Sequence, residues 1–287
     1  MTMKWLKVIV IGFMLFGKVA WAQDFILTPS MSADNPSIDK GHASCYDVRT
    51  RVLLNCEFRY VLSKGAYDGG HIAHNSPRPI GGLRFSGHTG KGITSLSFNS
   101  LWDVVYLEYV IPEVSGEIKL TITAIPPDPY RCVSNCFVER MGFIQVEGLE
   151  PMPASADGYW RLTGANGEPG VTSLHLFNHY GTSSTVGALS LIAWRYFEDT
   201  GGDSLGINDI SLPKGGLFDI NNDWVTPHSE HRAGTDADID RDGFDCEVDG
   251  LLWEAIEFVN KYGYVSGGQP KADLLCESRG RKHIDFD

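Results

Sequence analysis

The sequence predicts an α+β protein with two domains: an N-terminal all-β immunoglobulin-like sandwich, then a small α+β domain. Three observations support this. Short apolar runs separated by Gly and Pro clusters fill the first half of the chain, as in a sandwich. Two longer segments in the second half carry apolar residues at helical spacing. A Pro-containing stretch lies between the halves.

The N-terminal residues have the pattern of an export signal. Lys4 and Lys7 precede an apolar run over residues 8–17, and Ala20-Trp21-Ala22 supplies a small-x-small cleavage site. We therefore expect a secreted or periplasmic protein without stable membrane insertion after cleavage. The expected segments are a signal peptide (1–22), a β-sandwich module (23–150), a linker (151–160) and the second domain (161–287).

The charge of the chain argues against nucleic acid as a partner. The formal net charge is −12, and loss of the three lysines in the signal moves it to −15. Such a surface repels phosphate backbones.

Period-two alternation predicts the strands of the first domain. Ile118–Ala124 alternates apolar and polar residues, as a half-buried strand does, and Phe58–Leu62 and Val104–Val110 have strand length. In the second domain, 3.6-residue spacing predicts helices over Thr182–Thr200 and Leu251–Tyr262, each followed by glycine.

Further short strands are expected in the second domain, over Gly206–Leu212, Gly216–Ile220 and His283–Phe286. The six cysteines follow the predicted signal, and an even count in an exported chain favours disulfides. Nearest-neighbour pairing (45 with 56, 132 with 136, 246 with 276) is our preference, although the sequence does not fix the connectivity.

Residues 227–240 form the densest polar segment of the chain, PHSEHRAGTDADID. Imidazole nitrogens and carboxylate oxygens are the usual ligands of a catalytic zinc, which takes three protein groups and keeps one open position. His231 and Asp238 can both serve if the chain turns at Gly234. His283, in the predicted last strand, is the candidate third ligand.

The pattern His228-x-x-His231-x-x-Gly234-x-Asp-x-Asp238-Ile resembles the signature of penicillin-insensitive murein endopeptidases. These belong with the D-alanyl-D-alanine metallopeptidases among the LAS-type zinc peptidases. The resemblance includes the upstream Asp209-Ile-Ser-x-Pro-x-Gly-Gly216 and covers roughly residues 205–240 and His283. It implies a secreted zinc-dependent peptidase that hydrolyses amide bonds in peptidoglycan peptides, with zinc on His231, Asp238 and His283.

The chain departs from this family at the expected catalytic base. The family has a His two residues, or a Glu three residues, before the last zinc His; this chain has Arg281 and Gly280 there. Candidate replacements are His228, Glu230 and Asp285, and we favour His228. Arg281 can instead stabilise the developing oxyanion.

A second pattern overlaps the first. Residues Asp238–Asp249 resemble an EF-hand calcium loop, although the twelfth residue is Asp and no clear helix enters the loop. The alternatives to a peptidase are therefore a calcium-binding adhesion or binding protein and a zinc-binding pseudoenzyme. Oligomeric state is not predicted.

Other histidines suggest weaker hypotheses. His71 and His74 lie beside a Gly-Gly turn in the predicted β-module, and a surface hydrogen-bonding role is expected for them, with metal binding as the alternative. His175 and His179 lack the Glu of a His-Glu-x-x-His motif, so structural roles are expected.

Overall fold

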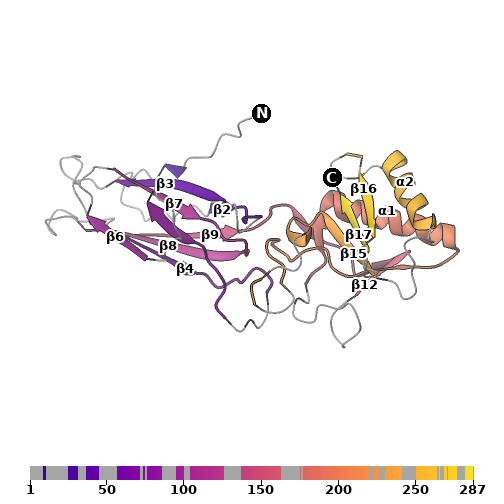
Figure 1. The fold of residues 1–287 in the computed structure, drawn as a ribbon, viewed down its shortest axis with the longest axis horizontal. Helices are drawn as coiled ribbons and strands as arrows, with labels where there is room; N and C mark the ends of the chain where they lie inside the picture. The colour runs from indigo at the N-terminus through magenta and orange to yellow at the C-terminus, as the bar shows by residue number, and fades with distance from the viewer. Residues whose placement is uncertain are drawn as a thin grey trace. The chain divides into compact units, whose positions relative to one another are not determined.

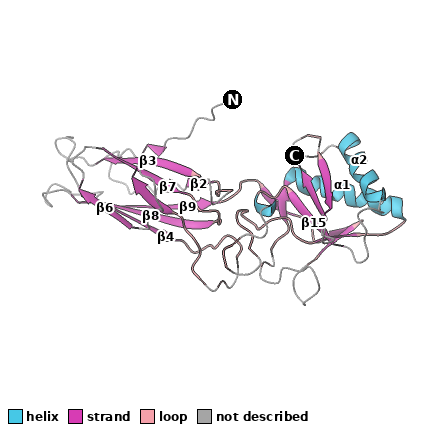
Figure 2. Cartoon of the chain, in the orientation of Figure 1, coloured by secondary structure: helices cyan, strands magenta, loops and turns pink. Residues whose placement is uncertain are grey.

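The computed structural model shows a mixed α+β protein made mostly of sheets, with two α-helices among the described residues (Figure 2). The fold class is therefore confirmed at this level. The described residues are 9–10, 25–31, 37–44, 57–71, 74, 76–85, 95–99, 104–125, 137–162, 175, 177–219, 223–225, 230–240, 250–263, 265, 268–269, 271–276 and 282–286. Of the predicted signal peptide, only residues 9–10 fall within them. No helix in these ranges is long and apolar enough to cross a membrane.

The chain forms two compact units, and each unit is made of two separate stretches of the chain. The first comprises residues 1–66 and 79–144, and the second comprises 67–78 and 145–287. Residues 67–78, which the sequence places inside the β-module, thus belong to the second unit. This short segment contributes two histidines, His71 and His74, to the α+β unit.

The first unit contains two sheets, whose strands run along the left of Figure 1. The strand orders are β1-β3-β7-β5 and β2-β9-β8-β4-β6. The strands are β1 (Ile9–Val10), β2 (Phe25–Leu27), β3 (Ile38–Ser44), β4 (Glu57–Lys64), β5 (Gly82–Phe85), β6 (Ser95–Asn99), β7 (Val104–Val110), β8 (Gly116–Ile125) and β9 (Phe137–Ile144).

Alternation builds the core of this unit as predicted. Phe58, Tyr60 and Leu62 of β4 are buried, while the residues between them face outward. They share one hydrophobic cluster with Leu107 of β7 and Ile118 of β8, so side chains of both sheets meet in it. The immunoglobulin-like type stays a prediction.

The second unit is built on a six-stranded sheet, with the order β11-β12-β14-β15-β17-β16, and a two-stranded β10-β13 sheet. Its elements are β10 (Leu149–Pro151), β11 (Ser155–Ala156), β12 (Tyr159–Arg161), β13 (Tyr180–Thr182), α1 (Ser183–Thr200), β14 (Leu205–Ile207), the 3-10 turn η1 (Glu230–Arg232), β15 (Asp236–Asp240), α2 (Gly250–Tyr262), β16 (Ala272–Cys276) and β17 (Lys282–Phe286).

Both predicted helices are confirmed, together with the reasons for their ends. The Thr182 hydroxyl accepts a hydrogen bond from the Thr185 backbone N–H at 3.1 Å and caps α1. At the other end Gly201 has φ +76°, the left-handed conformation of a C-terminal glycine. In α2, the N–H of Gly263 bonds to the carbonyl of Val259 at 2.8 Å and closes the last turn.

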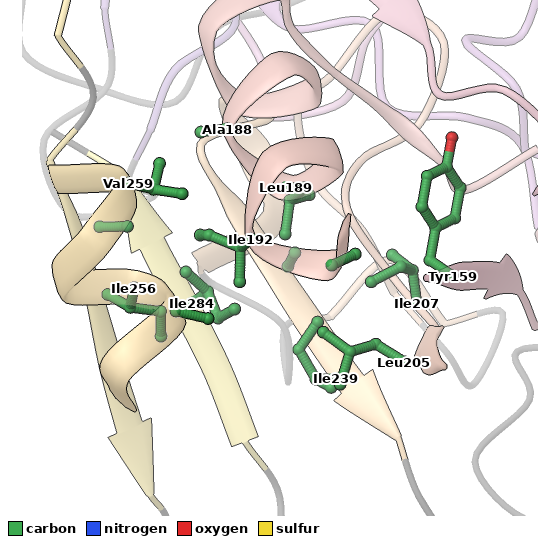
Figure 3. Close-up of a cluster of buried hydrophobic side chains, with 14 of the residues drawn as sticks. Tyr159, Ala188, Leu189, Ile192, Leu205, Ile207, Ile239, Ile256, Val259 and Ile284 are labelled. Carbon is green, nitrogen blue, oxygen red and sulfur yellow. The ribbon is translucent and has the colours of Figure 1, made fainter. Parts of the chain in front are cut away.

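The two helices pack their apolar faces on the sheet (Figure 3). Leu189 and Ile192 of α1 and Ile256 of α2 belong to one buried cluster with Ile239 of β15 and Ile284 of β17. This packing fixes β15, which carries Asp238, and β17, which carries His283. The opposite face of these two strands is thereby held in a defined position.

Candidate functional site

The central pair of strands in the second unit places predicted site residues opposite one another. In the β15–β17 ladder, Asp238 is the register partner of His283, and Asp236 is the partner of Asp285. Directly opposed residues of an antiparallel pair project to the same side of the sheet, and alternate residues of a strand share a face. The backbone thus puts these four positions on one face.

His231 reaches this face from the turn η1. Its side chain is fully buried, and its Nε2 lies 3.4 Å from Oδ1 of Asp238. On the other side of the ring, Nδ1 donates to the carbonyl of Ile210 at 3.0 Å. Because a carbonyl can only accept, Nδ1 carries a hydrogen, and Nε2 is the ring nitrogen that faces the carboxylate. A metal-ligating histidine normally has this arrangement.

Gly234 makes the connection from η1 to β15 possible. Its φ is +71°, and a Cβ at this position would lie 2.6 Å from Cδ2 of Leu149. The carbonyl of Gly234 accepts from the Thr182 N–H at 3.0 Å, so the turn is tied to the start of α1. The predicted turn at this glycine is confirmed.

The two halves of the sequence pattern meet in space. The backbone N–H of Asp238 donates to the carbonyl of Asp209 at 2.8 Å, and the N–H of Gly216 donates to the carbonyl of Arg232 at 2.8 Å. The Asp209 carboxylate is buried and accepts from the side-chain amide of Asn178. The Asp209–Gly216 segment is therefore bonded to β15 and η1 beside the residues that we call the β15–β17 group: His231, Asp236, Asp238, His283 and Asp285.

The electrostatics of this group favour a cation. Burial acts to lower the pKa of His231, but its hydrogen bond with Asp238 and the charges of Asp238, Asp209 and Asp236 outweigh burial and raise that pKa. Burial, the hydrogen bond with Asp285 and the charge of Asp285 raise the pKa of Asp236. Positive charge, as a proton or a metal ion, is thus drawn to this face.

Several predicted residues fall wholly or partly outside the described residues. His228 and Arg281 lie outside them, as does the side chain of His283, whose backbone lies in β17. Asp285 is half-buried opposite Asp236. Five cysteines also lie outside, and the sixth, Cys276, ends β16; the disulfide pairing stays a prediction.

The proposed calcium loop begins in a strand. Its first three positions, 238–240, are part of β15, which pairs with β14 on one side and β17 on the other. An EF-hand loop instead wraps its first ligands around the ion in a tight turn. Residues 241–249 lie outside the described residues.

A second group of ligand-type side chains, which we call the histidine cluster, lies in the same unit: His71, His74, His175 and Asp219. These four side chains form a group that can hold a metal ion, because one donor atom of each lies within 4.8 Å of all the others. Their side chains are 1%, 5%, 0% and 0% exposed. The expected surface role for His71 and His74 is therefore wrong.

The distances in the histidine cluster converge on one carboxylate oxygen. Asp219 Oδ1 lies 2.9 Å from His74 Nε2, 3.4 Å from His71 Nδ1 and 3.6 Å from His175 Nε2. His71 Nδ1 and His175 Nε2 are 3.1 Å apart. Burial acts to raise the pKa of Asp219, but hydrogen bonds from the three imidazoles and from the Trp224 N–H hold it well below its usual range. The carboxylate is therefore anionic.

Trp224 closes one side of the histidine cluster. Its indole stacks on the His74 ring at 3.7 Å between centroids, and its backbone N–H donates to Asp219 Oδ2 at 2.9 Å. Its indole N–H also bonds to the carbonyl of Ser76 at 3.1 Å. Trp224 has φ +59°, which is costly for a bulky residue and is retained here by these contacts.

Phe218 lies beside both groups. Its ring is fully buried, 5.1 Å from the His175 ring and 5.9 Å from the His231 ring, between centroids. The Phe218 ring therefore packs against one histidine of each group.

Comparison with known proteins finds no matching family model, no matching curated protein and no matching solved structure. Interpretation of the two groups therefore depends on their chemistry.

Proposed function

We propose that this protein is an exported zinc-dependent peptidase that hydrolyses amide bonds in peptidoglycan peptides, with zinc on His231, Asp238 and His283. One observation carries the proposal: His231 directs Nε2 at Asp238 Oδ1 from 3.4 Å, while β17 sets His283 opposite Asp238. Two imidazoles and a carboxylate are a usual ligand set for catalytic zinc.

The surroundings of these residues fit the proposal. The Ile210 carbonyl accepts from Nδ1 of His231, and this contact supports the tautomer that ligation needs. Bound zinc supplies Lewis acidity, which polarises a scissile carbonyl and lowers the pKa of water. Three protein ligands leave one coordination position open for water or the substrate carbonyl, whereas a structural zinc has four protein ligands.

The chain supplies candidate groups for proton transfer and charge stabilisation. We assign His228, three residues before His231, as the general base, because an imidazole titrates near neutrality. Asp285 orients its neighbours on the ligand face, and Arg281 offsets the developing negative charge. The first unit, as an immunoglobulin-like sandwich, would position the enzyme on its polymeric substrate.

Zinc is favoured over calcium because Asp238 faces an imidazole and lies in a paired strand. Measuring bound metal and muropeptide hydrolysis in the full chain tests the proposal. We expect His231→Ala to lose one zinc and all measurable hydrolysis, whereas Asp242→Ala, which changes only the calcium pattern, keeps both. Calcium retained by His231→Ala and lost by Asp242→Ala would assign the loop to calcium instead.

A further inference from the structure

We infer that the histidine cluster is a second metal site, which holds a divalent transition metal of the zinc class in a structural role. This inference does not depend on the proposed peptidase activity. Its ligands would be His71 through Nδ1, His74 and His175 through Nε2, and Asp219 through Oδ1.

The spacing of the donor atoms fits such an ion. Tetrahedral ligands at zinc bond lengths of about 2.0–2.1 Å lie roughly 3.3 Å from one another. Four separations between donor atoms of the cluster run from 2.9 to 3.6 Å, on either side of that value. The widest separation, at most 4.8 Å, needs one side chain to move inward. His74 is the candidate, because it is the most exposed of the four side chains.

The donor types select the metal. Imidazole suits zinc and its transition-metal neighbours, whereas calcium and magnesium take oxygen ligands. Three neutral imidazoles and one carboxylate leave a dication with a net charge of +1, which is tolerable in a buried site. If no ion were bound, apolar side chains at these buried positions would be more favourable than four polar ones, because buried polar groups need partners.

The polar contacts of the histidine cluster lie at its centre. Nε2 of His71 and Nδ1 of His175, the outer nitrogens, are buried without a hydrogen-bond partner among the described residues. The inner nitrogens of these rings converge instead on Asp219 Oδ1. Trp224 holds the second oxygen of Asp219, which leaves the first oxygen for the ion.

The burial of the cluster and its number of ligands indicate a structural rather than a catalytic metal. Four protein donors with side chains at most 5% exposed leave no open position for substrate, as in structural zinc sites. The ligands come from three chain segments, with His71 104 residues from His175 and His74 145 residues from Asp219. The ion would therefore fasten residues 67–78 to the rest of the second unit.

Zinc content of the full chain tests this inference. We expect His74→Ala and Asp219→Asn each to lose one zinc per chain relative to the unsubstituted protein prepared identically. His179→Gln is the matched control, because it replaces another buried histidine of the same unit outside the cluster, and it keeps the full content. Unchanged zinc in both cluster variants would overturn the inference.

A second measurement covers the case in which a cluster variant fails to fold, and it uses the His231→Ala protein. We expect this protein to bind one zinc that slows chymotryptic cleavage after Tyr67 and Trp224, with faster cleavage after chelation and recovery when zinc is restored. Absence of zinc binding in folded His231→Ala protein would overturn the inference. If His231→Ala protein binds as much zinc per chain as the unsubstituted protein, the histidine cluster keeps its assignment and the proposed peptidase site loses support.

Discussion

The β15–β17 group and the histidine cluster lie in one unit and use the same residue types, yet they are assembled differently. In the first, His231 and Asp238 are seven residues apart, and a single strand pairing adds His283. In the second, His71 and His74 meet partners that lie more than 100 residues further along the chain. The first has three candidate ligands and the second has four. If the proposed roles hold, the open site is built from a local turn and one strand pairing, whereas the closed site joins distant segments.

The largest effect that separates the two groups is expected from the proposed base. His228→Ala should keep the zinc content of both groups and lower muropeptide hydrolysis about 10²–10⁴-fold, since a general base contributes that much. Asp285→Asn should have a smaller effect. Steady-state rates and metal analysis of the same preparations provide the check. Full turnover in zinc-replete His228→Ala would remove this residue from the mechanism.

A substitution at Gly234 should lower the free energy of unfolding and should affect the β15–β17 group more than the histidine cluster. Gly234→Ala adds a Cβ 2.6 Å from Leu149 Cδ2 at φ +71°, and we expect a loss of roughly 2–5 kcal/mol from backbone strain and overpacking together. Urea unfolding measures the loss. Zinc should leave the β15–β17 group first, because the turn delivers His231 to it.

Gly201→Ala is the matched control for that substitution. Gly201 has φ +76°, but nothing lies within 4 Å of its added Cβ. It should therefore cost only the strain, roughly 1–2 kcal/mol. Equal losses for the two variants would show that packing against Leu149 has no part in the effect.

A third comparison uses a histidine outside both groups. His179 is buried and donates through Nε2 to the carbonyl of Ile207 at 2.9 Å. Burial lowers its pKa from 6.5 to about 4, against the opposing effect of that hydrogen bond. Between pH 6.5 and 4 the His179 imidazole is therefore protonated in the unfolded chain but still neutral in the folded chain.

The free energy of unfolding should accordingly fall by up to about 3 kcal/mol as pH drops from 6.5 to 4, and should then level off. Above pH 6.5 this contribution to stability is fully present. Urea unfolding at several pH values, in the unsubstituted protein and in His179→Gln, isolates the effect. Parallel pH profiles for the two proteins would show that His179 does not contribute.

The smallest expected effect is at the start of α1. Thr182→Ala removes the cap to the Thr185 N–H and should cost about 1 kcal/mol. Its backbone bond to Gly234 remains, so zinc should stay in both groups. Thermal unfolding and metal analysis provide the check, and loss of zinc would mean that the cap also positions the turn.

The fold was predictable wherever periodicity is local. The helices over 183–200 and 250–262 and the strand ending at Phe286 lie where the pattern of apolar residues placed them. The strand expected over Gly206–Leu212 is shorter, because β14 ends at Ile207. Beyond it, Ile210 and Ser211 bond through their N–H groups to the carbonyl of Asn178 rather than to a neighbouring strand.

The histidine cluster was not predictable in the same way. His-x-x-His at residues 71 and 74 was visible, but spacing cannot show that His175 and Asp219 fold onto it. Assigning residues 67–78 to the β-module also excluded that partnership, since the contact-defined units place this segment with residues 145–287. The available signal was chemical: Asp219 follows the apolar Leu217 and Phe218, and an Asp that is buried with such neighbours is almost always paired.

The position of β17 also has a consequence for when the proposed zinc site can form. This strand comes last in chain order, yet it lies between β15 and β16 in the sheet. During synthesis, residues 282–286 emerge after every other strand, so neither β15 nor β16 can complete its pairing until they arrive. Because His283 is on this strand, a nascent or partly exported chain would lack one ligand of the proposed catalytic zinc. The topology would thus delay the proposed peptidase activity until β17 has paired with β15.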